Sequence, residues 1–315
     1  MTANADSIDV LVSEVGPRDG LQSIKRTMPT DAKAVWIEAL AKAGLREIEV
    51  GSFVSPRAMP QMSDCAEVVA RSLKISGLRV AVLVPNRKYA QAAFEAGVHL
   101  ITVPVSVSEL HSLSNVRMTH PQIVEEVRAI VAVRNEQFPN TAIEAALSTA
   151  FGCTLQGLVP DDDVIRMAAT VVQGGVDMVN LSDTVGYANP VQVRRLFQKV
   201  RREIGDKCGG AHFHNTRGQG LANVVAALEV GVRTFDSSQG GLGGCPYAPG
   251  ATGNIVTEDL VFLLEAMGLR TNIDIDALIK AREILTTSLP GEPIYGHLPA
   301  AGLPKGFVLA AQRQV

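Results

Sequence analysis

The stretch IDVLVSEVGPRDG, residues 8–20, joins an apolar run rich in β-branched residues to a turn that contains glycine and proline. The run has the length and composition of a buried strand. A doubly wound open sheet that binds a dinucleotide would place the spacing G-x-G-x-x-G after its first strand, and GPRDG lacks that spacing. The turn therefore favours a closed barrel of parallel strands, with the open sheet as the weaker alternative.

The same succession of a short strand and a longer helix recurs along the chain. Seven further apolar runs begin near residues 45, 78, 99, 141, 176, 209 and 232. Capping residues and apolar spacing predict helices between them, among them 30–44, one from Asn86 to Gly97, one from Asn189 to Gly205, and 257–268. Because the runs are apolar on both faces, as parallel strands covered by helices are, we predict an α/β fold of the (β/α)8 TIM-barrel type.

No low-complexity linker divides the chain, so the barrel is expected to form a single unit. We assign residues 1–272 to the catalytic barrel. Residues 273–315 are predicted to form a short C-terminal helical extension that packs on the barrel.

Composition excludes several classes of protein. The 29 basic and 32 acidic residues give a net charge of -3 without a run of like charges, so a nucleic-acid partner is not expected. The polar start MTANADSID and the lack of an apolar run of about 20 residues predict neither a targeting segment nor a membrane span. The cysteines lie far apart and form no C-x-x-C pair, which favours a reducing, cytoplasmic location.

Polar side chains gather where the predicted strands end. In TIM barrels this rim carries the chemistry, because the loops that follow the strands all open on the same side. The rim residues are Arg18 and Asp19 after the first strand, Glu49, Asp183, and the pair His212 and His214. The last strand leads into the glycine-rich loop GGLGGCPYAPGATGN, residues 240–254, which contains Cys245 and Asn254.

His212 and His214 are two residues apart, so on a strand they leave the same face and can approach one ion. On its own, such a pair of histidines has a structural role about as often as a metal-binding one. With the carboxylate of Asp19 and the amide oxygen of Asn254, it favours Mg²⁺ or Mn²⁺, although imidazole also admits zinc. An exposed pair of Arg18 and Asp19 would contribute only about 0–1 kcal/mol, so an oxyanion that forms during a reaction explains the arginine better.

Four segments resemble the signature sequences of the 3-hydroxy-3-methylglutaryl-CoA lyase family, a group of metal-dependent lyases built on TIM barrels. They are VGPRDGLQ, IEVGSFVSP, HFHNTRGQGLANV and GGLGGCPYAPGATGNIVTEDLV, and the similarity runs from about residue 8 to 285. The resemblance implies cleavage of 3-hydroxy-3-methylglutaryl-CoA, or of a close branched 3-hydroxyacyl-CoA, to acetyl-CoA and acetoacetate or an analogous oxo acid. The implied cofactor is Mg²⁺ or Mn²⁺, and the implied partner is an acyl-CoA thioester, with a homodimer left open.

The resemblance also implies a role for each rim residue. The implied metal ligands are Asp19, His212, His214 and Asn254. The implied catalytic residues are Arg18, which stabilises the enolate oxygen, and Cys245, together with His212, Asp183 and Glu49. Gln22 is expected beside Arg18, where both contact the substrate.

The chain departs from the family pattern at three places. The family usually has Asp and Tyr where this chain has Asn215 and Arg217, and FGCTLQG, residues 151–157, lacks the usual Pro-Tyr-Glu-Gly. These departures leave the acyl group open, with a citramalyl-CoA-type lyase as an alternative. A condensing synthase of the same superfamily and a non-catalytic metal or acyl-CoA binding protein are further hypotheses. The Cys245 loop argues against the synthase, and Arg18 together with Cys245 argues against a mere binding protein.

Overall fold

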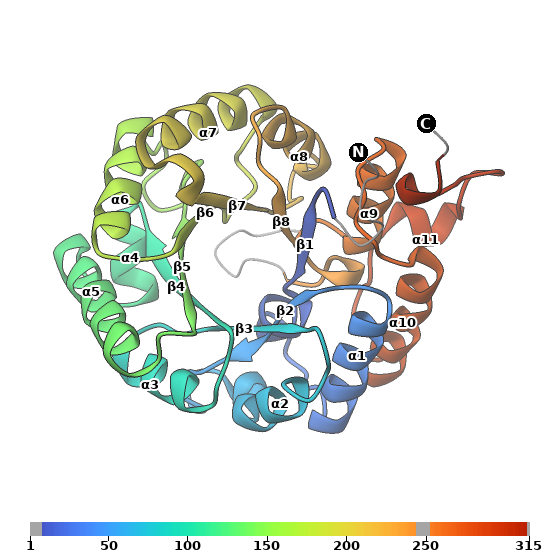
Figure 1. The fold of residues 1–315 in the computed structure, drawn as a ribbon, viewed down its shortest axis with the longest axis horizontal. Helices are drawn as coiled ribbons and strands as arrows, with labels where there is room; N and C mark the ends of the chain where they lie inside the picture. Colours follow the sequence, from blue (N-terminus) through green and yellow to red (C-terminus); the bar gives the residue numbers. More distant parts are fainter. Residues whose placement is uncertain (1–7, 244–252, 314–315) are drawn as a thin grey trace.

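The computed structural model describes residues 8–243 and 253–313, and its centre is a closed barrel of eight parallel strands (Figure 1). The strands follow one another in chain order, and β1 pairs with both β2 and β8. They are β1 (Leu11–Glu14), β2 (Glu47–Ser52), β3 (Arg79–Leu83), β4 (Leu100–Ser106), β5 (Ala142–Ser148), β6 (Met178–Asp183), β7 (Cys208–Phe213) and β8 (Thr234–Ser237). The predicted TIM barrel is therefore confirmed.

Helices surround the barrel and bury its outer face (Figure 1). They are α1 (Thr30–Lys42), α2 (Cys65–Ser72), α3 (Arg87–Glu95), α4 (Glu109–Asn115), α5 (His120–Gln137), α6 (Asp161–Gln173), α7 (Pro190–Ile204), α8 (Gly220–Glu229), α9 (Thr257–Ala266), α10 (Ile275–Ser288) and α11 (His297–Ala301). Within the described ranges, none of these helices is both long and apolar enough to cross a bilayer.

Local signals place the helix ends close to where the sequence predicts them. Asn86 begins α3 by accepting a hydrogen bond from the backbone N–H of Tyr89 at 3.3 Å. Asn189 begins α7 in the same way, with the N–H of Gln192 at 3.1 Å. Gly205, at φ 60°, follows the last residue of α7 in a backbone conformation that other residues rarely adopt.

Two parts of the chain contain helices that the pattern of eight strands and eight helices does not include. The connection between β4 and α5 contains α4, which begins at the capping residue Ser108. Beyond the barrel, α10 packs against α1 and α9, and α11 packs against α9 (Figure 1). The division of the chain at residue 272 stays a prediction.

The buried carboxyl group of Glu14 connects three segments at the seam between the first and last strands, and burial raises its pKa to about 8. Its Oε1 accepts hydrogen bonds from the backbone N–H groups of Gly16 at 2.8 Å and Gln239 at 2.9 Å. Its Oε2 accepts one from the hydroxyl of Thr257 at 2.7 Å. One side chain thus connects the turn after β1, the loop after β8 and the start of α9.

Replacing Glu14 with alanine should lower the free energy of unfolding by about 3 kcal/mol or more, because it leaves several buried donors without an acceptor. Glu14→Gln retains one acceptor oxygen and should cost clearly less. Urea unfolding of both variants and of the wild type measures the difference. An alanine variant as stable as the wild type would contradict the role given to this carboxylate.

Candidate active site

A cavity of about 790 Å³ lies inside the barrel and extends to the rim at the carboxyl ends of the strands. Six of the predicted site residues are among those that line it. The predicted residues that do so are Arg18, Asp19, Gln22, Glu49, His212 and His214.

Arg18 and Asp19 lie side by side in a π-helical turn, Gly16–Gly20, directly after β1. Such turns are rare and occur often at functional sites. The turn requires glycine at its start, because a Cβ atom at Gly16 would lie 2.5 Å from Oε1 of Glu14. The hydrogen bond between Gly16 and Glu14 therefore fixes where Arg18 and Asp19 enter the cavity.

Arg18 is held by two carboxylates. Its Nε donates to Glu49, which lies on β2, and its Nη1 donates to Oδ1 of Asp19 at 2.6 Å. Burial alone would lower the pKa of Arg18, but the charges of Glu49 and Asp19 raise it above the ordinary value. In the described part of the chain Nη2 has no hydrogen-bond partner, so it can donate to an oxygen of a bound molecule.

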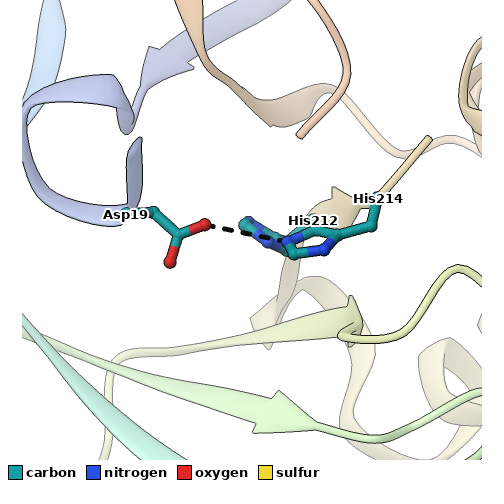
Figure 2. Close-up of side chains that lie close together, drawn as sticks. All are labelled: Asp19, His212 and His214. Atoms are coloured by element: carbon teal, nitrogen blue, oxygen red, sulfur yellow. Dashed lines mark ion pairs between the residues drawn. The ribbon is translucent and has the colours of Figure 1, made fainter. Parts of the chain in front are cut away.

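Asp19, His212 and His214 converge at the rim (Figure 2). One potential ligand atom from each of the three lies within 4.8 Å of the others. The Nε2 atom of His214 is 3.7 Å from Oδ2 of Asp19. Burial alone would raise the pKa of Asp19, but Arg18 and the two histidines hold it far below its ordinary range, so the carboxylate is ionised.

Asn254, the last residue of the glycine-rich loop, completes this group. Its Nδ2 donates to Oδ2 of Asp19 at 2.7 Å and to the carbonyl of Leu242 at 3.1 Å. Its Oδ1 is buried and has no partner among the described residues. An orphaned amide oxygen beside a carboxylate and two imidazoles is a donor set that suits a divalent cation. The residues present therefore fit the predicted metal.

Asp236 on β8 is a site residue that the sequence analysis missed. Its Oδ2 lies 3.1 Å from Nδ1 of His212 and accepts a hydrogen bond from Asn180 at 3.2 Å. Occupation of Nδ1 leaves Nε2 as the ring nitrogen of His212 that an ion can use. Burial alone would lower the pKa of His212, but Asp236 raises it above the ordinary value. A carboxylate inside a predicted buried strand was the available signal.

The remaining predicted residues differ in where they lie. Gln22 donates to Oδ1 of Asp19 at 2.7 Å, as expected for a neighbour of Arg18. Asp183 does not line the cavity; it accepts hydrogen bonds from the backbone of Tyr187 at 2.8 Å and Ala188 at 3.1 Å. It therefore organises the loop between β6 and α7. Cys245 lies outside the described residues.

Arg217 contacts the outside of this loop and not the cavity. Its Nη1 donates to the carbonyls of Val185 at 3.0 Å and Gly186 at 3.1 Å, and its guanidinium lies 4.6 Å from the ring centre of Tyr187. Asn215 accepts a hydrogen bond from the N–H of Gly220, the first residue of α8, at 3.0 Å. Neither departure from the family pattern removes a metal-binding group.

Comparison with known protein families gives a match over most of the chain: residues 9–285 match the HMGL-like family. The chain belongs to the HMGL-like family. A hydroxymethylglutaryl-CoA lyase of Bacillus subtilis is 38% identical over 90% of this chain and 94% of its own length. One from Pseudomonas mevalonii is 39% identical over 85% of this chain and 89% of its own length.

Solved structures of HMGL-like proteins have the same fold. An HMG-CoA lyase from Acinetobacter baumannii, in complex with coenzyme A and 3-methylmalate, is 41% identical, with a TM-score of 0.89 over 98% of this chain and 99% of that one. HMGL-like proteins depend on a divalent metal, and the group formed by Asp19, His212 and His214 offers this chain a site for one.

Asp236→Asn should weaken divalent-metal binding about 10- to 100-fold, because the charge that orients His212 and raises its basicity is lost. Calorimetric titration of the metal-free protein with Mn²⁺ measures the affinity without any need for turnover. Asp206→Asn, a fully exposed aspartate before β7, is the matched control. Equal affinities in the two variants would mean that Asp236 does not position the histidine.

Proposed function

We propose that this protein cleaves 3-hydroxy-3-methylglutaryl-CoA to acetyl-CoA and acetoacetate. The observation that carries the proposal is the assembly of Arg18 with Asp19, His212, His214 and the orphaned oxygen of Asn254 at one rim of the barrel. Identities of 38% and 41% to hydroxymethylglutaryl-CoA lyases over nearly the whole chain support it. The coenzyme A in the Acinetobacter structure supports a CoA thioester as the substrate here.

The reaction breaks the bond between C2 and C3 of the acyl group. The C3 hydroxyl loses its proton and becomes the ketone of acetoacetate, while the bonding electrons move into the thioester as an enolate, which is then protonated at carbon. A divalent ion held by Asp19, His212, His214 and Asn254 supplies, when bound, the Lewis acidity that lowers the pKa of the hydroxyl. Oxygen and imidazole donors without a thiolate favour Mg²⁺ or Mn²⁺ for this role.

Arg18 is placed to stabilise the enolate oxygen. Glu49 and Asp19 fix the guanidinium before substrate arrives, so little reorganisation is needed when negative charge develops. Arg18 lines the cavity, and its Nη2 would donate to the thioester oxygen. Because Arg18 stays charged throughout, it contributes electrostatic stabilisation and moves no proton.

Proton transfer is assigned to a thiol. His212 lines the cavity, and Asp236 holds its ring through Nδ1, so the ring presents Nε2 to the ion in a fixed orientation. Cys245 is proposed as the group that protonates the enolate carbon, on its sequence context alone. A cytoplasmic location is proposed from the spacing of the cysteines.

Purified protein should release acetyl-CoA from 3-hydroxy-3-methylglutaryl-CoA in a coupled assay. Dialysis against a chelator should abolish the release, and Mg²⁺ or Mn²⁺ should restore it, because the hydroxyl is no longer acidified without the ion. Citramalyl-CoA, assayed in parallel, tests the alternative acyl group. Absence of acetyl-CoA from the methylglutaryl thioester would reject the proposed function, and full activity after metal removal would reject the metal's role.

Cys245→Ser should lower kcat about 10²- to 10⁴-fold, the usual cost of losing a positioned proton donor. Its affinity for Mn²⁺ should equal that of the wild type, since the thiol is not assigned as a ligand. Cys208→Ala, on the first residue of β7 and so at the end of the barrel away from the candidate site, is the control for removal of a thiol. If Cys245→Ser has the same kcat as the Cys208→Ala control, Cys245 is not the proton donor.

A further inference from the structure

The active-site cavity continues below the metal-binding residues into the body of the barrel. It is lined by Glu47 and Leu100, the first residues of β2 and β4, and by Glu144, the third residue of β5. The interior of a TIM barrel is ordinarily filled by bulky branched side chains. Here small side chains line the same space, namely those of Ser13, Ala81, Thr102 and Ala146.

Glu144 stands out among the carboxyl groups of this cavity. It is only 9% exposed, and the described part of the chain offers it no hydrogen bond or ion pair. Its three neighbours all have partners: Glu47 accepts from Arg79 at 2.8 Å, Glu49 pairs with Arg18, and Asp236 contacts His212. Because Glu144 lines the cavity and is not bound by another described side chain, a ligand that donates a hydrogen bond can complete its bonding.

The charges around Glu144 define which group can approach it. Burial raises the pKa of Glu144 well above its ordinary value, and the charges of Asp236, Glu47 and Glu49 raise it further. The same three carboxylates repel any anionic group in this part of the cavity. In either protonation state Glu144 retains an oxygen that accepts a hydrogen bond. The complementary group is therefore a hydrogen-bond donor without negative charge, and a hydroxyl is the smallest such group that an acyl branch can carry.

We propose that the floor of the cavity, formed by Glu144 with Ala81, Leu100, Thr102 and Ala146, binds an uncharged branch of the acyl group that ends in a hydroxyl. This inference rests on the proposed function, because it places the branch on the carbon that carries the tertiary hydroxyl. The substrate class then extends to 3-hydroxyacyl thioesters whose branch is longer than a methyl group and donates a hydrogen bond to Glu144.

The test compares acyl-CoA thioesters that differ only at the end of the branch. The methyl group on C3 of the methylglutaryl thioester is replaced by hydroxymethyl or ethyl, and then by 2-hydroxyethyl or propyl. The wild type should prefer the hydroxyl member of at least one pair by roughly tenfold or more in kcat/KM, because the methyl member leaves Glu144 unpaired. A carboxymethyl branch should be the poorest substrate of the series. Equal kcat/KM values within both pairs would overturn the inference.

Two variants show whether Glu144 makes the contact. Glu144→Leu should abolish the preference for the hydroxyl member, while Glu144→Gln, which retains an acceptor oxygen, should keep it. Glu47→Gln is the matched control, because its carboxylate lies in the same cavity but is already bound by Arg79. A control that changes the ratio as much as Glu144→Leu does would overturn the direct contact and assign the effect to the general charge of the cavity.

The same preparations separate this inference from the proposed function. Failure to cleave the methylglutaryl thioester rejects the proposed function, and the inference falls with it. Cleavage of that thioester with no discrimination within either pair rejects the inference alone. Because the wild-type ratios are measured first, the result does not depend on whether Glu144→Leu folds.

Discussion

The three hydrogen bonds accepted by Glu14 hold together the segments from which the candidate site is built. The N–H of Gly16 begins the turn that carries Arg18 and Asp19, and the hydroxyl of Thr257 belongs to a residue three positions beyond Asn254. One buried carboxyl group therefore connects the turn that carries Asp19 with the segment that follows Asn254. A change that loosens this seam should disturb the metal-binding group even though Glu14 contacts no part of it.

The cavity contains an imbalance of charge that a divalent ion would reduce. The residues that line it include five with carboxyl groups and two with guanidinium groups. The carboxyl groups belong to Asp19, Glu47, Glu49, Glu144 and Asp236, and the guanidinium groups belong to Arg18 and Arg117. Buried charge is costly unless it is paired, and Arg18 is already shared between two of the carboxylates. A divalent cation bound at the rim would add the positive charge that an incoming acidic thioester requires. It would then serve substrate binding as well as the proposed polarisation of the hydroxyl.

The sequence predicted the rim of the barrel far better than its interior. Arg18, Asp19, His212 and His214 could be placed together because parallel strands all end at the same edge, and Asn86 could be identified as a cap because its partner lies only three residues away. Which side chains meet inside the barrel depends instead on strand register across elements far apart in the chain. The contact of Asp236 with His212 and the isolation of Glu144 follow from that register, and a carboxylate within a predicted strand does not indicate which side chain it meets.

The residues that first left the acyl group undecided lie outside the cavity of the candidate active site. Phe151, Gly157 and Arg217 line a separate hollow together with Tyr187, on the outer side of the loops after β5 and β6. Since Arg217 is bound there by two backbone carbonyls, it does not reach an acyl group in the barrel. Selection of the acyl branch must then come from side chains that point inward from β3, β4 and β5. Apart from Leu83, Leu100, Pro104 and Glu144 these side chains are small, and Glu144 is the one among them that has a carboxyl group.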